Sequence, residues 1–135
     1  KAYEVFRSNG APEAVIVACG SLVHNALLAA AELEKKGVMV VVINNHTVKP
    51  MDEETIIASA REAGAVVTVE EHQVMGGMGS AVAEVLCKNY PVPMEFVGVQ
   101  NQFGESGSPA ELLEKFGMGV KSIMEAVQRA ITRKR

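Results

Sequence analysis

Aromatic residues, cysteines and basic clusters are scarce in this chain of 135 residues. Tryptophan is absent, and aromatics make up 4% of the residues against 48% hydrophobic, so the core must be aliphatic. The two cysteines, Cys19 and Cys87, match neither a metal-ligand spacing nor the disulfide framework of a small secreted domain. We therefore expect a reducing, cytoplasmic location. The net charge is −3. The sequence has no basic stripe interleaved with aromatic residues, which is the pattern that would indicate nucleic-acid binding.

Long hydrophobic runs are also missing. The longest, such as residues 38–43, are much too short to cross a bilayer, and no signal peptide is visible. The length fits one domain, residues 1–135. The chain begins at Lys1 rather than at a methionine, so we expect it to be a fragment of a longer chain.

Short apolar runs alternate with helical patterns along most of the sequence. Runs without polar alternation indicate strands buried on both faces, as in a parallel sheet. The predicted strands cover residues 1–6, 14–19, 38–43, 65–69 and 94–99. This alternation predicts an α/β fold with three layers and a mostly parallel sheet.

Capping residues mark the predicted helices. Ser21 is expected to cap the first helix and Gly37 to end it, while Asp52 and Gly64 play these parts for the second. A third helix follows a glycine cluster at 76–79. Near the C-terminus, Ser108 and the following proline and glutamate predict a short helix that stops at Gly117, before a last helix over 120–131.

The glycine cluster Gly76, Gly77 and Gly79 is the first candidate site. Backbone N–H groups at a helix N-terminus attract anions. However, the dinucleotide pattern is incomplete because Val82 stands where its last glycine belongs, and the P-loop lysine is missing. We favour tight turning and close packing as the role of these glycines, and keep anion binding as the alternative.

Glu70, Glu71 and His72, just before the glycines, are the second candidate. Neighbours on an extended strand point to opposite faces, so Glu70 and Glu71 diverge, whereas Glu70 and His72 can share a face. Such a pair offers a His–carboxylate dyad or two metal ligands, without a third partner. His24 and His46 are interpreted as solvated or capping. We therefore assign no catalytic and no metal-binding residue.

Three segments together resemble one family: HTVKPMD at 46–52, VTVEEHQVMGGMGSAVAEVL at 67–86 and FGESGSPAELLEKFGM at 103–118. They are similar to the C-terminal domain of transketolase, and most similar to the split, two-subunit type. The first two motifs are shared with deoxyxylulose-phosphate synthase and with the β subunits of 2-oxo-acid dehydrogenases, which stay as alternatives. The third motif favours transketolase. A free-standing anion-binding or phosphate-binding module is the remaining alternative.

The resemblance implies a five-stranded sheet of order 1-3-2-4-5 with an antiparallel N-terminal edge strand. A crevice would lie where the strand order reverses. Its expected lining is Gly20, Ser21, Glu71 and His72.

The resemblance also implies a function. Transketolases transfer two-carbon ketol units between sugar phosphates, in the pentose phosphate pathway, with thiamine diphosphate and a divalent metal such as Mg held by two other domains. The chain has no G-D-G motif, so we expect it to bind no cofactor and to catalyse nothing alone. The implied partners are the remaining transketolase domains or subunit and a homodimer mate.

Overall fold

The computed structural model describes residues 2–46, 51–100 and 108–134, and only the backbone of 109–118. Five strands form one sheet. They are β1 (Ala2–Arg7), β2 (Ala14–Ala18), β3 (Val40–Asn45), β4 (Val66–Glu71) and β5 (Met94–Val99). Their order is β1-β3-β2-β4-β5. β1 is antiparallel to β3, and the other pairs are parallel. The predicted order and the antiparallel edge strand are confirmed.

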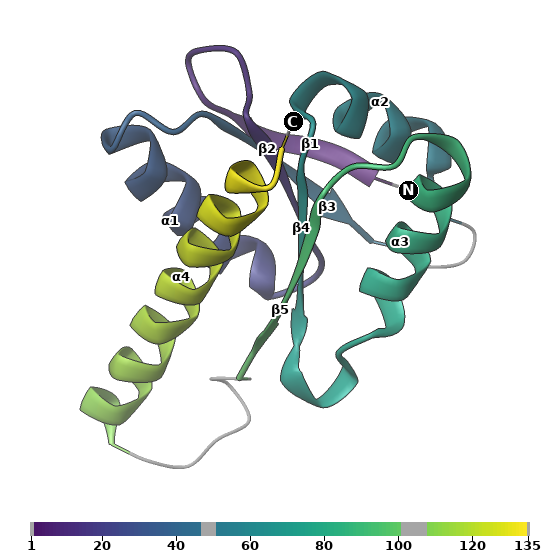
Figure 1. Cartoon of the computed structure of the whole chain (residues 1–135). Helices are drawn as coiled ribbons and strands as arrows, with labels where there is room; N and C mark the ends of the chain where they lie inside the picture. Colours follow the sequence, from purple (N-terminus) through teal and green to yellow (C-terminus); the bar gives the residue numbers. More distant parts are fainter. Residues whose placement is uncertain (1, 47–50, 101–107, 135) are drawn as a thin grey trace.

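Helices cover both faces of the sheet. They are α1 (Leu22–Lys35), α2 (Glu53–Ala63), the short 3₁₀ helix η1 (His72–Val74), α3 (Gly77–Asn89) and α4 (Pro109–Thr132). Figure 1 shows α1 and α4 on one side of the strands and α2 and α3 on the other. The predicted three-layer α/β fold is confirmed. In the described part of the chain, no helix combines the length and the apolar character needed to span a membrane.

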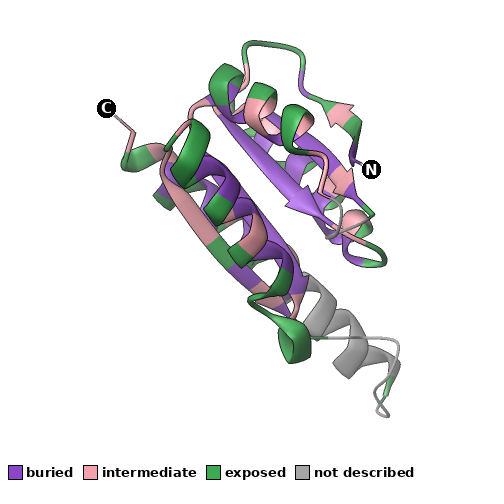
Figure 2. Ribbon diagram, turned by 90° about the vertical axis from the view of Figure 1, so that its right-hand side faces the viewer, coloured by how far each residue is buried: buried purple, intermediate pink, exposed green. Residues whose placement is uncertain are grey.

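The sheet separates two aliphatic clusters. One lies under α1 and α4 and includes Ile16, Leu33 and Ile123, and the other lies under α2 and α3 and includes Val17, Ile43 and Leu86. Consecutive strand residues alternate between the two clusters. Burial is therefore concentrated on the strands and on the inward sides of the helices (Figure 2). This two-sided burial explains the unbroken apolar runs of the sequence.

Most of the predicted caps are present. The Asp52 side chain accepts a hydrogen bond from Thr55 N at 3.2 Å, and Gly64 closes α2 in the left-handed conformation at φ 84°. Gly37 has φ 82° at the end of α1. The cap expected from Ser21 is wrong in one respect: Ser21 stands at the N-cap position but forms no side-chain capping bond. Its helical φ of −64° and ψ of −19° explain this, because capping side chains reach back from an extended residue.

The prediction of two helices near the C-terminus is wrong. α4 begins at Pro109 as expected but continues unbroken through Gly117 and Gly119 to Thr132. A helical glycine costs only about 1 kcal/mol relative to alanine, and packing can offset that cost. A Cβ on Gly119 would lie 3.0 Å from Val99 Cγ1 and 3.3 Å from Asn25 Nδ2. The missing side chain thus lets α4 approach the sheet closely.

Lys134 ties the end of α4 to two distant segments. Its ammonium group donates to Glu13 O and to Ala63 O, both at 2.8 Å. We expect Lys134→Met to lower the free energy of unfolding by about 1–2 kcal/mol, because two charge-assisted bonds to partly buried carbonyls are lost. Urea denaturation measures the change. The matched control is Lys88→Met, because the Lys88 side chain is 71% exposed and its ammonium lies 3.7 Å from Glu84. A loss of equal size in both variants would contradict the role assigned to Lys134.

Candidate functional site

The strand order reverses between β2 and β4, which are parallel neighbours. The helix after β2 covers one face of the sheet, and the helix after β4 covers the other (Figure 1). The loops that leave the two strands therefore separate at their carboxyl ends. Such a point is the usual place for a ligand in an open α/β sheet.

Four of the predicted site residues lie at this reversal. Gly20, with φ 61°, and Ser21 are exposed between β2 and α1. Glu71 is the half-buried last residue of β4, and His72 is exposed at the start of η1. All four lie at or just after the carboxyl ends of β2 and β4. The crevice itself stays a prediction.

Glu70 is the residue that organises the start of α3. Its side chain is 4% exposed, and its carboxylate accepts hydrogen bonds from three backbone N–H groups. The donors are Gly76 N at 3.2 Å, Met78 N at 2.8 Å and Gly79 N at 2.9 Å. These are amides that a helix leaves unpaired at its N-terminus. The negative charge also lies at the positive end of the helix dipole.

An anion site at α3 is therefore filled from within the chain. Both carboxylate oxygens of Glu70 are used on the amides that an external phosphate would need. A phosphate approaching the same amides would also meet a like charge. The geometry disfavours the anion-binding interpretation of Gly76, Gly77 and Gly79.

The glycines themselves have separate tasks. Gly76 adopts φ 109°, which only glycine tolerates readily, and so directs the chain from η1 into α3. Gly79 is buried, and a Cβ there would lie 2.7 Å from Phe96 Cδ2 and 2.9 Å from both Glu70 Oε2 and Thr68 Oγ1. Gly79 thus lets α3 contact the sheet and the carboxylate, as the close-packing interpretation expects.

Glu70 and His72 do not form a His–carboxylate dyad in the structure. Both oxygens of Glu70 accept backbone amides, so the carboxylate is not available to orient an imidazole. His72 lies over β5 instead: its Nδ1 is 3.2 Å from the position that a Cβ on Gly98 would take. The two side chains lie on one face of the sheet, as expected, since Gly98 is the register partner of Glu70 in β5, but the structure shows no pairing between them.

Cys19 follows β2 on the same face as Glu70. Burial raises the pKa of the Cys19 thiol, and the nearby carboxylates of Glu70 and Glu71 raise this pKa further. The thiol is therefore protonated at neutral pH and a weak nucleophile. Cys19 and Cys87 are both free thiols.

Sequence reasoning placed the glycine helix correctly but missed the function of Glu70. A signal was available: Glu70 stands one residue before the end of a buried strand, and the glycine cluster that opens α3 follows six to nine residues later. A buried carboxylate needs donors, and the nearest unpaired donors in such a sequence are the first amides of the helix.

Another hollow lies at the opposite end of the sheet, with a volume of about 450 Å³. Its lining includes Tyr90, Pro91, Arg133 and Lys134. The two cations already bind within the chain, because Lys134 donates to backbone carbonyls and Arg133 pairs with Glu95 at 2.9 Å. This hollow offers no unoccupied charge for a ligand.

The fold is a doubly wound α/β domain, and Glu70 caps the glycine-rich start of α3 where the strand order reverses. These two features define the class of protein. A sequence model described as "Transketolase, C-terminal domain" matches residues 4–123. The chain belongs to the transketolase C-terminal domain family.

Individual relatives agree with this family. The chain is 49% identical over 122 residues to the 6-deoxy-6-sulfo-D-fructose transketolase subunit SqwH of Clostridium sp. (strain MSTE9), covering 90% of the chain and 38% of the relative. It is 41% identical over 126 residues to a 1-deoxy-D-xylulose-5-phosphate synthase of Synechococcus sp. (strain JA-2-3B'a(2-13)), covering 93% and 19%.

A solved structure shares the fold along the whole chain. It is a split-gene transketolase described as an inactive beta4 tetramer, with a TM-score of 0.82 and 46% identity, covering 100% of this chain and 43% of that one. The chain thus spans less than half the length of these relatives.

The complete enzymes of this family depend on thiamine diphosphate. The described residues do not fit that group. The glycine helix end, which could hold a diphosphate, carries the Glu70 carboxylate. Within the same residues, no cluster of three or more His, Cys, Asp or Glu side chains could hold a metal ion.

Proposed function

We propose that the chain is the C-terminal domain of a transketolase of the split, two-subunit type. The complete enzyme would transfer two-carbon ketol units between sugar phosphates. The observation that carries the proposal is the agreement of two comparisons over nearly the whole chain, 49% identity with a transketolase subunit and 46% with a split-gene transketolase of the same fold.

The proposed contribution of the chain is assembly rather than chemistry. The α3 helix end is satisfied internally by Glu70, and the Cys19 thiol is held protonated. The remaining domains or a partner subunit would supply thiamine diphosphate and Mg²⁺, and a homodimer mate would complete the assembly. The rim of Gly20, Ser21, Glu71 and His72 would face the active-site approach or a neighbouring subunit.

The cellular setting follows from the same proposal. Ketol transfer between sugar phosphates belongs to the pentose phosphate pathway, and we propose a cytoplasmic location. The two free thiols support a reducing compartment.

One relative keeps a second candidate open. The 41% identity with 1-deoxy-D-xylulose-5-phosphate synthase favours the equivalent domain of that enzyme. The transketolase comparisons are stronger in identity and include a solved structure that the whole chain matches. A 2-oxo-acid dehydrogenase β subunit remains a third context for the same fold.

Reconstitution tests the proposal. The chain, joined to a pyrimidine-binding domain and mixed with a diphosphate-binding subunit, should transfer ketol units from a sugar-phosphate donor, whereas the mixture without the chain should lose at least about 90% of this activity through failed assembly. Donors should include 6-deoxy-6-sulfo-D-fructose, named for one relative. Formation of 1-deoxy-D-xylulose 5-phosphate instead would favour the synthase. Full activity without the chain would overturn the assembly role.

A further inference from the structure

The two edges of the sheet are built differently. At the β1 edge, the pairing register shifts between Glu4 and Phe6. Arg7 on the same strand pairs with Glu4 at 2.8 Å and with Glu62 at 2.7 Å. Irregular pairing and charged side chains are the usual means of preventing an edge strand from pairing with another chain. The β1 edge is therefore protected.

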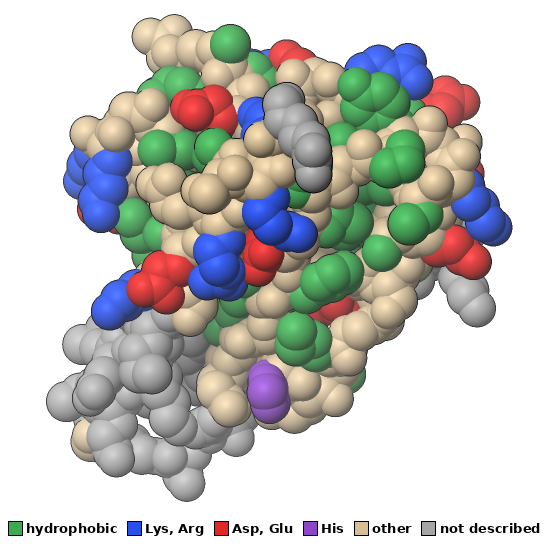
Figure 3. All heavy atoms as spheres, in the orientation of Figure 1, with side chains coloured by type: hydrophobic (Ala, Val, Ile, Leu, Met, Phe, Trp, Pro, Cys, Tyr) green, Lys and Arg blue, Asp and Glu red, His purple; other side chains and the backbone are tan. Residues whose placement is uncertain are grey.

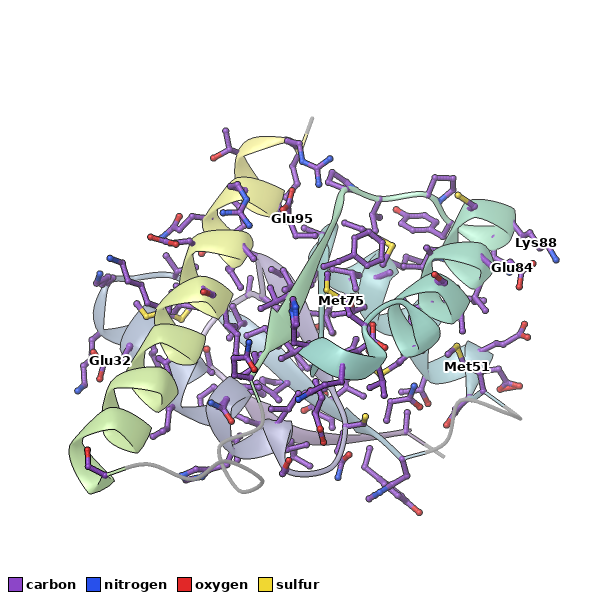
Figure 4. The ribbon with its side chains drawn as sticks, turned by 90° about the horizontal axis from the view of Figure 1, so that it is seen from below. Glu32, Met51, Met75, Glu84, Lys88 and Glu95 are labelled. Carbon is purple, nitrogen blue, oxygen red and sulfur yellow. The ribbon has the colours of Figure 1, made fainter. Side chains whose placement is uncertain are left out.

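The β5 edge is less protected, although Arg133 donates to the outward-facing C=O of Met94 at its start. β5 pairs with β4 in continuous register from Met94 to Val99. Its one charged residue, Glu95, points towards α4, where it binds Arg129 at 3.0 Å and Arg133 at 2.9 Å. Figure 4 shows Glu95 on the α4 side of β5 and Met75 on the α3 side. The outer edge of β5 thus presents no charge of its own strand.

The backbone of β5 offers hydrogen bonds at this edge. Val66 N donates to Pro93 O at 3.0 Å, so Pro93 O faces β4. Because the direction of these groups alternates along a parallel strand, Glu95 and Val97 also face β4. Phe96 and Gly98 then turn their N–H and C=O groups outwards. Among the described residues, neither has a backbone partner on that side.

Exposed apolar side chains lie on β5 and on the adjoining segment of η1 and its C-cap. Val74 is 64% exposed, Met75 45% and Phe96 42%. Met75 lies against β5, since its sulfur is 2.7 Å from where a Cβ on Gly98 would be. We call Val74, Met75, Phe96 and Gly98 the β5-edge surface. Figure 3 shows hydrophobic side chains gathered where β5 and the start of α3 lie in Figure 1, beside a group of basic and acidic residues.

We propose that the β5-edge surface binds a second copy of this chain through antiparallel pairing of the two β5 strands. In one register, Val97 of one copy lies opposite Val97 of the other, and Phe96 of each copy lies opposite Gly98 of the other. Each Phe96–Gly98 pair then forms two hydrogen bonds, from the N–H of each residue to the C=O of the other. The Phe96 ring would then cover a residue that has no side chain and would reach Met75, where sulfur–aromatic contact is favourable.

A second copy of the chain fits the β5-edge surface better than a partner whose surface carries charges of a single sign. A two-fold interface must be complementary to itself, and the rim of the β5-edge surface carries both signs, Glu95 beside Arg129 and Arg133. The choice of occupant rests on the proposed function in one respect: the similar split-gene transketolase is described as a tetramer. The pairing geometry rests on this chain alone.

Sedimentation velocity over a range of concentrations tests the proposal. The chain should form dimers, and Phe96→Lys should raise the dissociation constant at least about 30-fold, as expected for the loss of a central aromatic contact. Val74→Glu should weaken the dimer as well without touching the core, since Val74 is 64% exposed. The matched control is Val5→Lys on the protected edge, where the side chain is 43% exposed. It should leave the constant within about 3-fold.

Amide hydrogen exchange gives a second, independent result. The amides of Phe96 and Gly98 should become protected as the concentration rises, and Phe96→Lys should abolish the protection of Gly98. A chain that stays monomeric at every concentration would overturn the proposal, as would a dimer that tolerates both Phe96→Lys and Val74→Glu or leaves these amides unprotected. None of these results bears on ketol transfer, which reconstitution measures separately.

Discussion

Replacing Glu70 by alanine should lower the free energy of unfolding by about 3–4 kcal/mol. The change leaves the amides of Gly76, Met78 and Gly79 without the acceptor that they now share. An unpaired buried donor costs about 1–3 kcal/mol, and the charge at the helix N-terminus is lost as well. Urea denaturation followed by circular dichroism measures the change.

A conservative variant separates the charge from the shape. Glu70→Gln keeps the length of the side chain but points one NH₂ group at N–H donors, so we expect a smaller loss of about 2 kcal/mol. The control is Glu84→Ala, because Glu84 is 70% exposed and pairs with the equally exposed Lys88 at 3.7 Å. It should stay within about 0.5 kcal/mol of the unchanged protein.

Acetate should rescue the alanine variant. With Glu70 removed, the α3 N-terminus becomes an anion site, and acetate binding to it should raise the urea midpoint of Glu70→Ala more than that of the unchanged chain. An equal response to acetate in both proteins would contradict internal capping. Stabilisation of the unchanged chain by phosphate would revive the anion-binding module.

Substitution of Gly79 should have the second large effect. In Gly79→Ala, the new Cβ would lie 2.7 Å from Phe96 Cδ2 and 2.9 Å from Glu70 Oε2 and Thr68 Oγ1, all closer than real contacts allow. The helix must move away or the carboxylate must leave the amides. We expect a loss of about 2–3 kcal/mol, the usual cost of overpacking, by the same urea titration.

Gly77→Ala is the matched control two residues earlier in α3. Among the described residues, the nearest neighbour of its new Cβ would be Glu70 Oε1 at 3.7 Å, an ordinary contact. Alanine also has the better helix propensity. This variant should therefore be neutral or slightly stabilising. If both alanines are tolerated equally, close packing is not the reason for a glycine at position 79.

The strands and their layers could be predicted because their signal is local. Residues such as Val15, Ile16 and Val17 are buried on alternating faces, and only a sheet covered on both sides needs such runs. The strand order and the antiparallel β1 depend on contacts between distant segments. They came from the family resemblance rather than from the residues.

The sequence-based predictions were wrong where contacts between distant residues determine the local structure. Gly117 looked like a helix end, but α4 continues to Thr132, and Gly119 shows that close packing on Val99 can favour a glycine inside a helix. Glu70 looked like a candidate partner of His72 because strand periodicity puts the two side chains on one face. The amides of α3 take the carboxylate instead, and only the folded chain brings those amides to it.

The position of α4 has a consequence for synthesis of the chain. Ile123, Ala126, Val127 and Ala130 of α4 pack in the same cluster as the inner residues of α1, and Lys134 then bonds to Glu13, 121 residues earlier. A nascent chain that ends after β5 thus has every strand but only half of the cover on this face. Its aliphatic surface stays exposed until the ribosome releases α4, which makes that interval the time when aggregation or chaperone binding competes with folding.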